Sequence, residues 1–179
     1  MIKLILQNKR VKFYGNICIV LSVLTCLLFG SAYSQTSRSS FGDVTGLPIP
    51  RFVSTKSDRV NVRIGPGRDY SINWVYRRKG LPLKVIAEYD NWRKVEDFEG
   101  EGGWVHSRLI SGNRFIIFLS ETSNLKRKAN EKSPNLAIIE RGVIAKLLST
   151  SPSWCKVSVN GFSGWVLRSR VWGVEKNNL

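Results

Sequence analysis

The sequence predicts an all-β protein built from two small β-barrels in tandem. The main observation is an internal repeat, because Trp92-Arg93-Lys94-Val95 recurs as Trp154-Cys155-Lys156-Val157 and Gly103-Trp104-Val105 recurs as Gly164-Trp165-Val166. The tryptophans are offset by 154 − 92 = 62 and 165 − 104 = 61 positions. A fixed offset indicates one structural unit used twice. Short alternating segments between Gly-rich turns favour strands, and no segment shows convincing helical periodicity.

The N-terminal segment, residues 1–34, has the order of a secretory signal peptide. Basic residues come first, an apolar run covers residues 17–29, and small residues follow at the recognition positions 32 and 34. The apolar run has 29 − 17 + 1 = 13 residues, whereas a helix needs about 20 to span a bilayer. We therefore predict cleavage before Gln35 and a periplasmic or secreted protein. The alternative is an uncleaved segment that stays in the membrane as an anchor.

The predicted layout has five parts: a signal peptide at 1–34, a flexible linker at 35–55, a first domain at 56–112, a second, divergent domain at 113–175, and a C-terminal tail at 176–179. The linker is rich in Ser, Thr, Gly and Pro, and Pro48 and Pro50 exclude a helix. We expect its end, residues 51–53, to dock on the first domain. Because each domain is small, we also expect the two to pack on each other.

Several strands can be placed from the pattern. Apolar residues occupy alternate positions from Leu81 to Tyr89, which predicts a strand with one buried face. Asp90-Asn91 predicts a tight turn after it. In the second unit, the continuous apolar run 115–118 favours a strand buried on both sides. Asn160-Gly161 is the strongest hairpin signal in the chain.

Charge and residue inventory limit the function. The chain has 28 Lys and Arg against 13 Asp and Glu, a net charge of +15, which favours an anionic partner. A single histidine, His106, excludes a multi-histidine metal site. Cys18 and Cys26 lie in the predicted signal peptide, so Cys155 alone remains and forms no internal disulfide. Basic, Trp-rich surfaces also suit nucleic acids, but export argues against that partner.

The motifs of the first unit resemble those of the bacterial SH3-like (SH3b) domain: Asn61-Val62-Arg63, Gly65-Pro66, Gly80, Trp92-x-Lys94-Val95 and Gly103-Trp104-Val105. The second unit keeps most of them but has Arg127-Lys128 in place of Gly-Pro. The resemblance covers roughly residues 56 to 174, and the layout is similar to exported tandem SH3-like proteins of Gram-negative bacteria. It implies small barrels that bind peptides or cell-wall material, often beside wall hydrolases, without catalysis of their own.

The candidate ligand-binding residues are aromatic and arginine side chains of the first unit. A groove between the 65–71 loop and the 90–92 hairpin would suit an extended peptide. The set is Arg63, Arg68, Tyr70, Trp74, Tyr76, Tyr89 and Trp92. The alternative is that these residues cover the barrel end or the contact between the units. We expect Trp104 and Trp165, with Gly103 and Gly164, to be core or structural positions.

The enzymatic alternative is a cysteine hydrolase that pairs Cys155 with His106. Cys155 shares a strand face with Val157 and Val159, however, which predicts a small buried hydrophobe. Acidic residues at 96–101 lack the pattern of a calcium loop and predict a solvated hairpin. We therefore expect a non-enzymatic periplasmic module, without cofactor or metal, that binds peptide or peptidoglycan and meets the membrane only through its signal peptide. The alternative is a scaffold that docks a partner envelope enzyme and has no small ligand.

Overall fold

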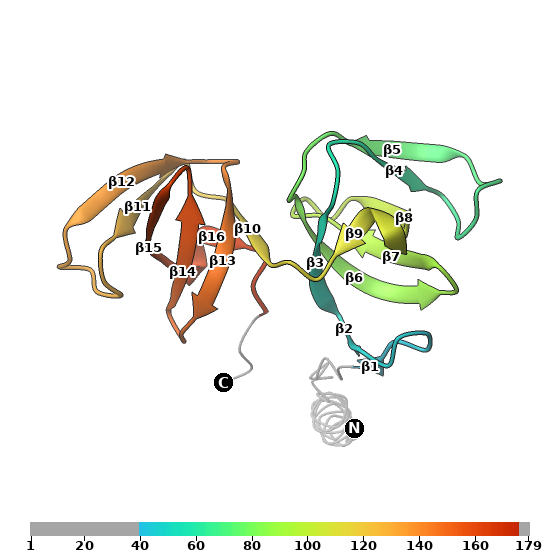
Figure 1. Ribbon diagram of the computed structural model, residues 1–179, viewed down its shortest axis with the longest axis horizontal. Coiled ribbons are helices and arrows are strands. Elements are labelled where there is room, and N and C mark those ends of the chain that lie inside the picture. Colours follow the sequence, from blue (N-terminus) through green and yellow to red (C-terminus); the bar gives the residue numbers. More distant parts are fainter. Residues whose placement is uncertain (1–39, 176–179) are drawn as a thin grey trace, which may run out of the picture. The chain divides into compact units, whose positions relative to one another are not determined.

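The computed structural model describes residues 40–175, and nearly all of their regular structure is β (Figure 1). The predicted all-β class is therefore confirmed. The helices among these residues are two single 3-10 turns, Ser107–Leu109 and Arg168–Arg170. No helix in this range is long and apolar enough to cross a membrane. The predicted signal peptide, the cleavage site before Gln35 and the 176–179 tail lie outside the described residues.

The first domain is a seven-stranded antiparallel sheet with the order β5-β4-β8-β7-β6-β3-β9. Its strands are β3 (Arg51–Thr55), β4 (Val60–Arg63), β5 (Ile72–Tyr76), β6 (Pro82–Tyr89), β7 (Trp92–Glu96), β8 (Gly102–His106) and β9 (Ile110–Ser111). A short hairpin, β1 (Ser40–Phe41) and β2 (Pro48–Ile49), precedes them.

The second domain repeats this arrangement in the order β12-β11-β15-β14-β13-β10-β16, so each strand has a counterpart in the first domain. Its strands are β10 (Phe115–Phe118), β11 (Thr122–Lys126), β12 (Asn135–Glu140), β13 (Ile144–Thr150), β14 (Trp154–Val159), β15 (Phe162–Leu167) and β16 (Val171–Trp172). The repeat inferred from the tryptophan motifs is thus a repeat of the whole topology.

The predicted linker, residues 35–55, differs from the structure at its C-terminal end. Residues 51–55 form β3, which pairs with β6 and with β9 inside the first sheet. Val53, Ser54 and Thr55 are buried, and the Thr55 hydroxyl donates to the Arg78 carbonyl at 2.6 Å. Residues 51–53 therefore dock on the first domain as expected, but they do so as part of a strand that continues through Ser54 and Thr55, which composition had assigned to the linker.

Each domain has its own apolar core. The first is formed by side chains on alternate positions of β4, β6 and β7, chiefly Val60, Val62, Leu83, Val85 and Val95. The second contains Phe118, Leu125, Cys155, Val157 and Val166. The strand 115–118 is buried as predicted except at Phe115, which is half-buried: Ile116 and Phe118 belong to the second core, and Ile117 belongs to the first.

The alternation predicted from Leu81 to Tyr89 holds only as far as Val85. A register shift between Val85 and Ala87 interrupts the pairing of β6 with β7. Beyond it Ala87 is half-buried and Tyr89 is exposed. A bulge changes which face a side chain occupies, so periodicity predicted the strand but not the burial of its second half.

Candidate functional site

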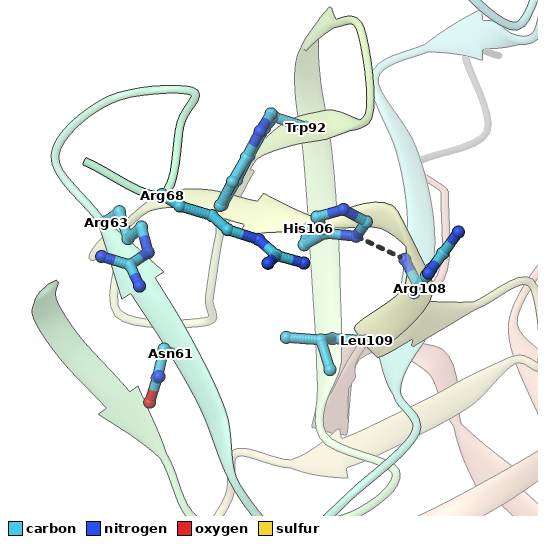
Figure 2. Close-up of a pocket in the computed structure, with 7 residues that line it drawn as sticks. All are labelled: Asn61, Arg63, Arg68, Trp92, His106, Arg108 and Leu109. Atoms are coloured by element: carbon cyan, nitrogen blue, oxygen red, sulfur yellow. Dashed lines mark hydrogen bonds between the residues drawn. The ribbon is translucent and has the colours of Figure 1, made fainter. Parts of the chain in front are cut away.

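The first domain contains a pocket of about 400 Å³ that gathers three of the predicted ligand-binding residues. Figure 2 shows its lining, with the Arg68 side chain extending across the pocket toward His106. We call it the arginine pocket, and its residues are Asn61, Arg63, Arg68, Trp92, His106, Arg108 and Leu109.

A glycine-containing loop carries Arg68 to the pocket. The Ile64 N–H donates to the Ser71 carbonyl at 3.2 Å, and the Arg63 guanidinium donates to the Tyr70 carbonyl, so the loop is closed at its base. The Tyr70 ring packs over Gly65, where a Cβ would lie 2.4 Å from the ring atom Cδ1. Only glycine leaves room for this ring, which explains the Gly at this position.

Trp92 and His106 are opposite each other in the pairing of β7 with β8. Their rings meet edge to face with centroids 5.3 Å apart. The turn beside them is fixed by Arg93, whose Nη1 donates at 2.8 Å to the carbonyls of Asp90 and of Trp92. The Ser107 N–H donates to the Asn91 carbonyl at 2.8 Å, which ties this turn to the 3-10 segment.

His106 is held as a neutral hydrogen-bond donor. The Arg108 backbone N–H donates to its Nδ1 at 3.2 Å, so the ring proton resides on Nε2. Burial, followed by the charges of Arg108 and Arg68, lowers the pKa of His106 below its usual 6.5. The neutral imidazole can therefore donate through Nε2 at neutral pH.

The arginine pocket is electrostatically one-sided. Three of its lining residues are arginines, and no Asp or Glu among the described residues lines it. Within residues 40–175, the ion pairs involve other basic groups: Arg51 and Arg93 with Glu88, Lys84 with Glu96, and Arg114 with Glu175. Three guanidinium groups without carboxylate partners create a site for an anion.

Behind the turn lies a buried carboxylate, Glu88, whose side chain has no exposed surface. Arg51 Nη2 donates to it at 2.6 Å, and Arg93 Nε lies 3.4 Å away. The backbone and hydroxyl of Thr45 donate to it at 2.9 and 2.7 Å. Burial would raise the pKa of Glu88, but the hydrogen bonds from Thr45 and Arg51 outweigh it and lower the pKa to about 2. Sequence analysis missed this network, because Glu88 reads as an exposed strand residue.

The structure does not bring the other predicted ligand residues into the arginine pocket. Tyr70 and Tyr89 are exposed, and Trp74 lies on β5 beside a different hollow. The structure contradicts the assignment of Tyr76 as a ligand-binding residue. Tyr76 is only 4% exposed, and its hydroxyl donates to Asp97 Oδ2 at 3.1 Å. Burial and the Asp97 charge raise the pKa of Tyr76 well above its usual value. Its role is structural.

The residues assigned to the core need a partial correction. Trp104 and Trp165 are half-buried, whereas the adjacent Val105 and Val166 occupy the cores. Gly103 and Gly164 permit close strand contact, since a Cβ at either would lie 2.7 Å from the carbonyl oxygen of Arg63 or Lys126, respectively.

The acidic hairpin is also less solvated than predicted. Asp97 is buried and accepts hydrogen bonds from the Glu99 and Glu101 N–H groups at 3.0 and 3.1 Å. Its carboxylate therefore closes the turn. Among residues 40–175, no group of three His, Cys, Asp or Glu is placed to hold a metal ion.

The cysteine-hydrolase alternative gains no support from the geometry. Cys155 is fully buried in the second core, and burial raises the pKa of its thiol. A nucleophilic cysteine needs an accessible thiolate. His106 lies on β8 of the other domain.

A second pocket, of about 230 Å³, occupies the corresponding place in the second domain. Trp154 replaces Trp92 and Lys126 replaces Arg63, but Leu167 stands where the first domain has His106. The lining also includes Glu131. The two pockets are thus equivalent in the fold and different in chemistry. The sequence signal that could have located this pocket is the repeated tryptophan.

These features define a tandem repeat of a small all-β domain with a basic pocket on its first copy. The family model described as bacterial SH3 domain matches residues 56–112 and 120–173, which is more than half of the chain. The chain therefore belongs to the bacterial SH3 domain family, as the motifs had suggested.

Comparison with individual proteins identifies a similar protein of which this chain matches only a part. The chain is 28% identical over 156 residues to the Bacillus subtilis (strain 168) protein named "Putative N-acetylmuramoyl-L-alanine amidase YrvJ". The match covers 80% of this chain but only 29% of that relative. Two solved structures from Trichomonas vaginalis, NlpC2 and NlpC1, share 8% and 7% identity. They cover 69% and 68% of this chain, and this chain covers 48% and 45% of them. Both TM-scores are 0.32, which is too low to show a shared fold.

Proposed function

We propose that this protein is a non-enzymatic binding module of the cell envelope that recognises peptide or peptidoglycan through carboxylate groups. The observation that carries the proposal is the arginine pocket, in which Arg63, Arg68 and Arg108 line one cavity that no acidic residue of the range 40–175 lines. Cell-wall stem peptides carry several free carboxylates, and arginine binds carboxylates through paired, charge-assisted hydrogen bonds.

The residues of the arginine pocket would contact different parts of the ligand. The guanidinium of Arg68, which extends across it, would bind the carboxylate, and the Nε2–H of His106 would donate a further hydrogen bond. Trp92 would contact the apolar part of the ligand. Because Arg93 fixes the turn from behind, the Trp92 backbone is already held in place, which reduces the entropy lost on binding.

The likeness to YrvJ supports a location at the cell wall. This chain spans only 29% of that relative's length, and the family model that matches this chain is that of the bacterial SH3 domain, which is why binding, and not the relative's reaction, is proposed for it. The predicted signal peptide at residues 1–34 would deliver it to the periplasm or outside the cell.

The test is a titration of purified muropeptides against intrinsic Trp fluorescence, with each muropeptide also supplied in a form whose carboxylates are amidated. We expect the free acids to bind and the amides to bind at least about tenfold more weakly, because charged hydrogen bonds contribute about 1.5 to 3 kcal/mol. Arg68→Ala should weaken binding similarly. Arg127→Ala removes the same charge from the corresponding loop of the second domain and serves as the matched control. Equal binding of acids and amides would refute the proposal.

A further inference from the structure

The strand β5 forms one end of the first sheet (Figure 1). Among the strands in residues 40–175, it pairs with β4 alone, with Val60 opposite Tyr76 and Val62 opposite Trp74. The backbone N–H and C=O groups on its outer side thus have no strand partner in this part of the chain. Such an edge is a template for a further strand.

The composition of this edge is unusual. Natural edge strands are commonly protected by charged residues or proline, but the β5 sequence Ile-Asn-Trp-Val-Tyr contains neither. Ile72 is 46% exposed and Trp74 is 52% exposed. A hollow of about 370 Å³ follows the strand and is lined by residues 72–75. The edge therefore presents apolar side chains beside free backbone groups.

The second domain shows that folding does not require a tryptophan here. Trp74 is opposite Val62 in the β4–β5 pair, and the corresponding partner of Leu125 in the β11–β12 pair is Ala137. A small residue thus serves the same position in the same sheet order. An exposed Trp in its place adds apolar surface for a ligand.

The charge around β5 indicates what kind of segment would bind. Outside the arginine pocket, residues 58 to 79 contain four basic side chains, Arg59, Arg77, Arg78 and Lys79, and two acidic ones, Asp58 and Asp69. Arg77 and Lys79, which directly follow the strand, are exposed. An added strand with acidic side chains would meet a complementary potential.

We propose that the outer edge of β5 binds an extended acidic segment of a partner protein as an additional antiparallel or parallel strand, with Trp74 and Ile72 contacting its apolar side chains. This is β-augmentation, in which backbone hydrogen bonds supply affinity and alternate side chains supply specificity. The site is separate from the arginine pocket, because none of residues 72–75 lines that pocket.

The probe is the peptide acetyl-Glu-Val-Glu-Val-Glu-Val-Gly-amide, which has no terminal carboxylate. Its competitor is the same peptide N-methylated at every residue, which keeps the side chains but removes the ladder donors from both edges. We expect the unmodified peptide to bind and the N-methylated peptide to bind at least about tenfold more weakly. Amide hydrogen exchange at alternate positions of residues 72–76 should slow on binding.

Variants separate this edge from other surfaces. Trp74→Glu should abolish peptide binding, because the variant loses the apolar contact and adds a charge that repels the acidic peptide. Ile138→Glu on β12, the equivalent edge of the second domain, is the matched control, and Arg68→Ala should leave binding intact. Equal affinity of the N-methylated peptide, or full binding by Trp74→Glu, would overturn the proposal. So would concentration-dependent dimerisation that Trp74→Glu removes, because the occupant would then be a second copy of this chain.

Discussion

The buried carboxylate Glu88 offers a quantitative test of the structure. Its pKa falls from 4.5 to about 2 on folding, and a tenfold change in an ionisation constant corresponds to about 1.4 kcal/mol. The hydrogen bonds from Thr45 and Arg51 therefore stabilise the folded protein by about 3 kcal/mol at neutral pH. Glu88→Gln should lower the free energy of unfolding by about this amount, since it also leaves Arg51 and Arg93 without a carboxylate.

The pH dependence supplies a second signature. Because the folded-state pKa lies below the unfolded-state value, the stabilisation is fully present above pH 4.5 and is lost as the pH falls toward 2. Urea unfolding followed by Trp fluorescence would measure both effects. The control is Glu96→Gln, whose partner Lys84 is 3.9 Å away and exposed, and which should cost less than about 0.5 kcal/mol. Equal stability of the two variants would show that the Glu88 network is not formed in solution.

Three further predictions concern the pocket and the cores. Affinity for a carboxylate ligand should rise as the pH falls toward the lowered pKa of His106, because the bound anion favours the protonated form of His106, and His106→Gln should remove this rise in a fluorescence titration. Gly164→Ala should destabilise the protein by about 2 kcal/mol, because its Cβ would lie 2.7 Å from the Lys126 carbonyl oxygen. Gly112→Ala, where a Cβ meets nothing within 4 Å, should change stability by less than about 0.5 kcal/mol in the same chemical denaturation assay. Cys155 should react with a thiol reagent only as fast as the second domain unfolds, and rapid labelling of the native protein would contradict its burial.

Part of the fold was predictable from the sequence because its physical cause is local. The hairpin at Asn160-Gly161 has positive φ at both central residues, as that dipeptide requires. Gly103 and Gly164 differ from this hairpin, because the carbonyl oxygens that exclude a Cβ belong to Arg63 and Lys126 on other strands. The turn could be recognised from neighbouring residues alone, whereas these glycines were recognised from the repeat of Gly-Trp-Val.

The candidate site was predictable only in part. Arg63, Arg68 and Trp92 were expected near a ligand, and the structure places them in one pocket. His106 and Arg108 were not, because their proximity arises from the pairing of β7 with β8 and from the 3-10 turn after it. Tyr76 was misassigned, since an aromatic residue at the end of a strand can serve either a ligand or a buried carboxylate, and only the position of Asp97 decides between them.

By itself, the sequence determined that the chain repeats one small β unit, because alternation and turn residues act over a few neighbouring positions and the repeat doubles the signal. Tertiary structure alone decided which charges are free. Glu88 neutralises Arg51 and Arg93 from a buried position, whereas none of the carboxylates in the described part of the chain lines the pocket of Arg63, Arg68 and Arg108. Electrostatic pairing depends on distances of a few ångströms between strands that are far apart in the chain, and no pattern along the sequence encodes those distances.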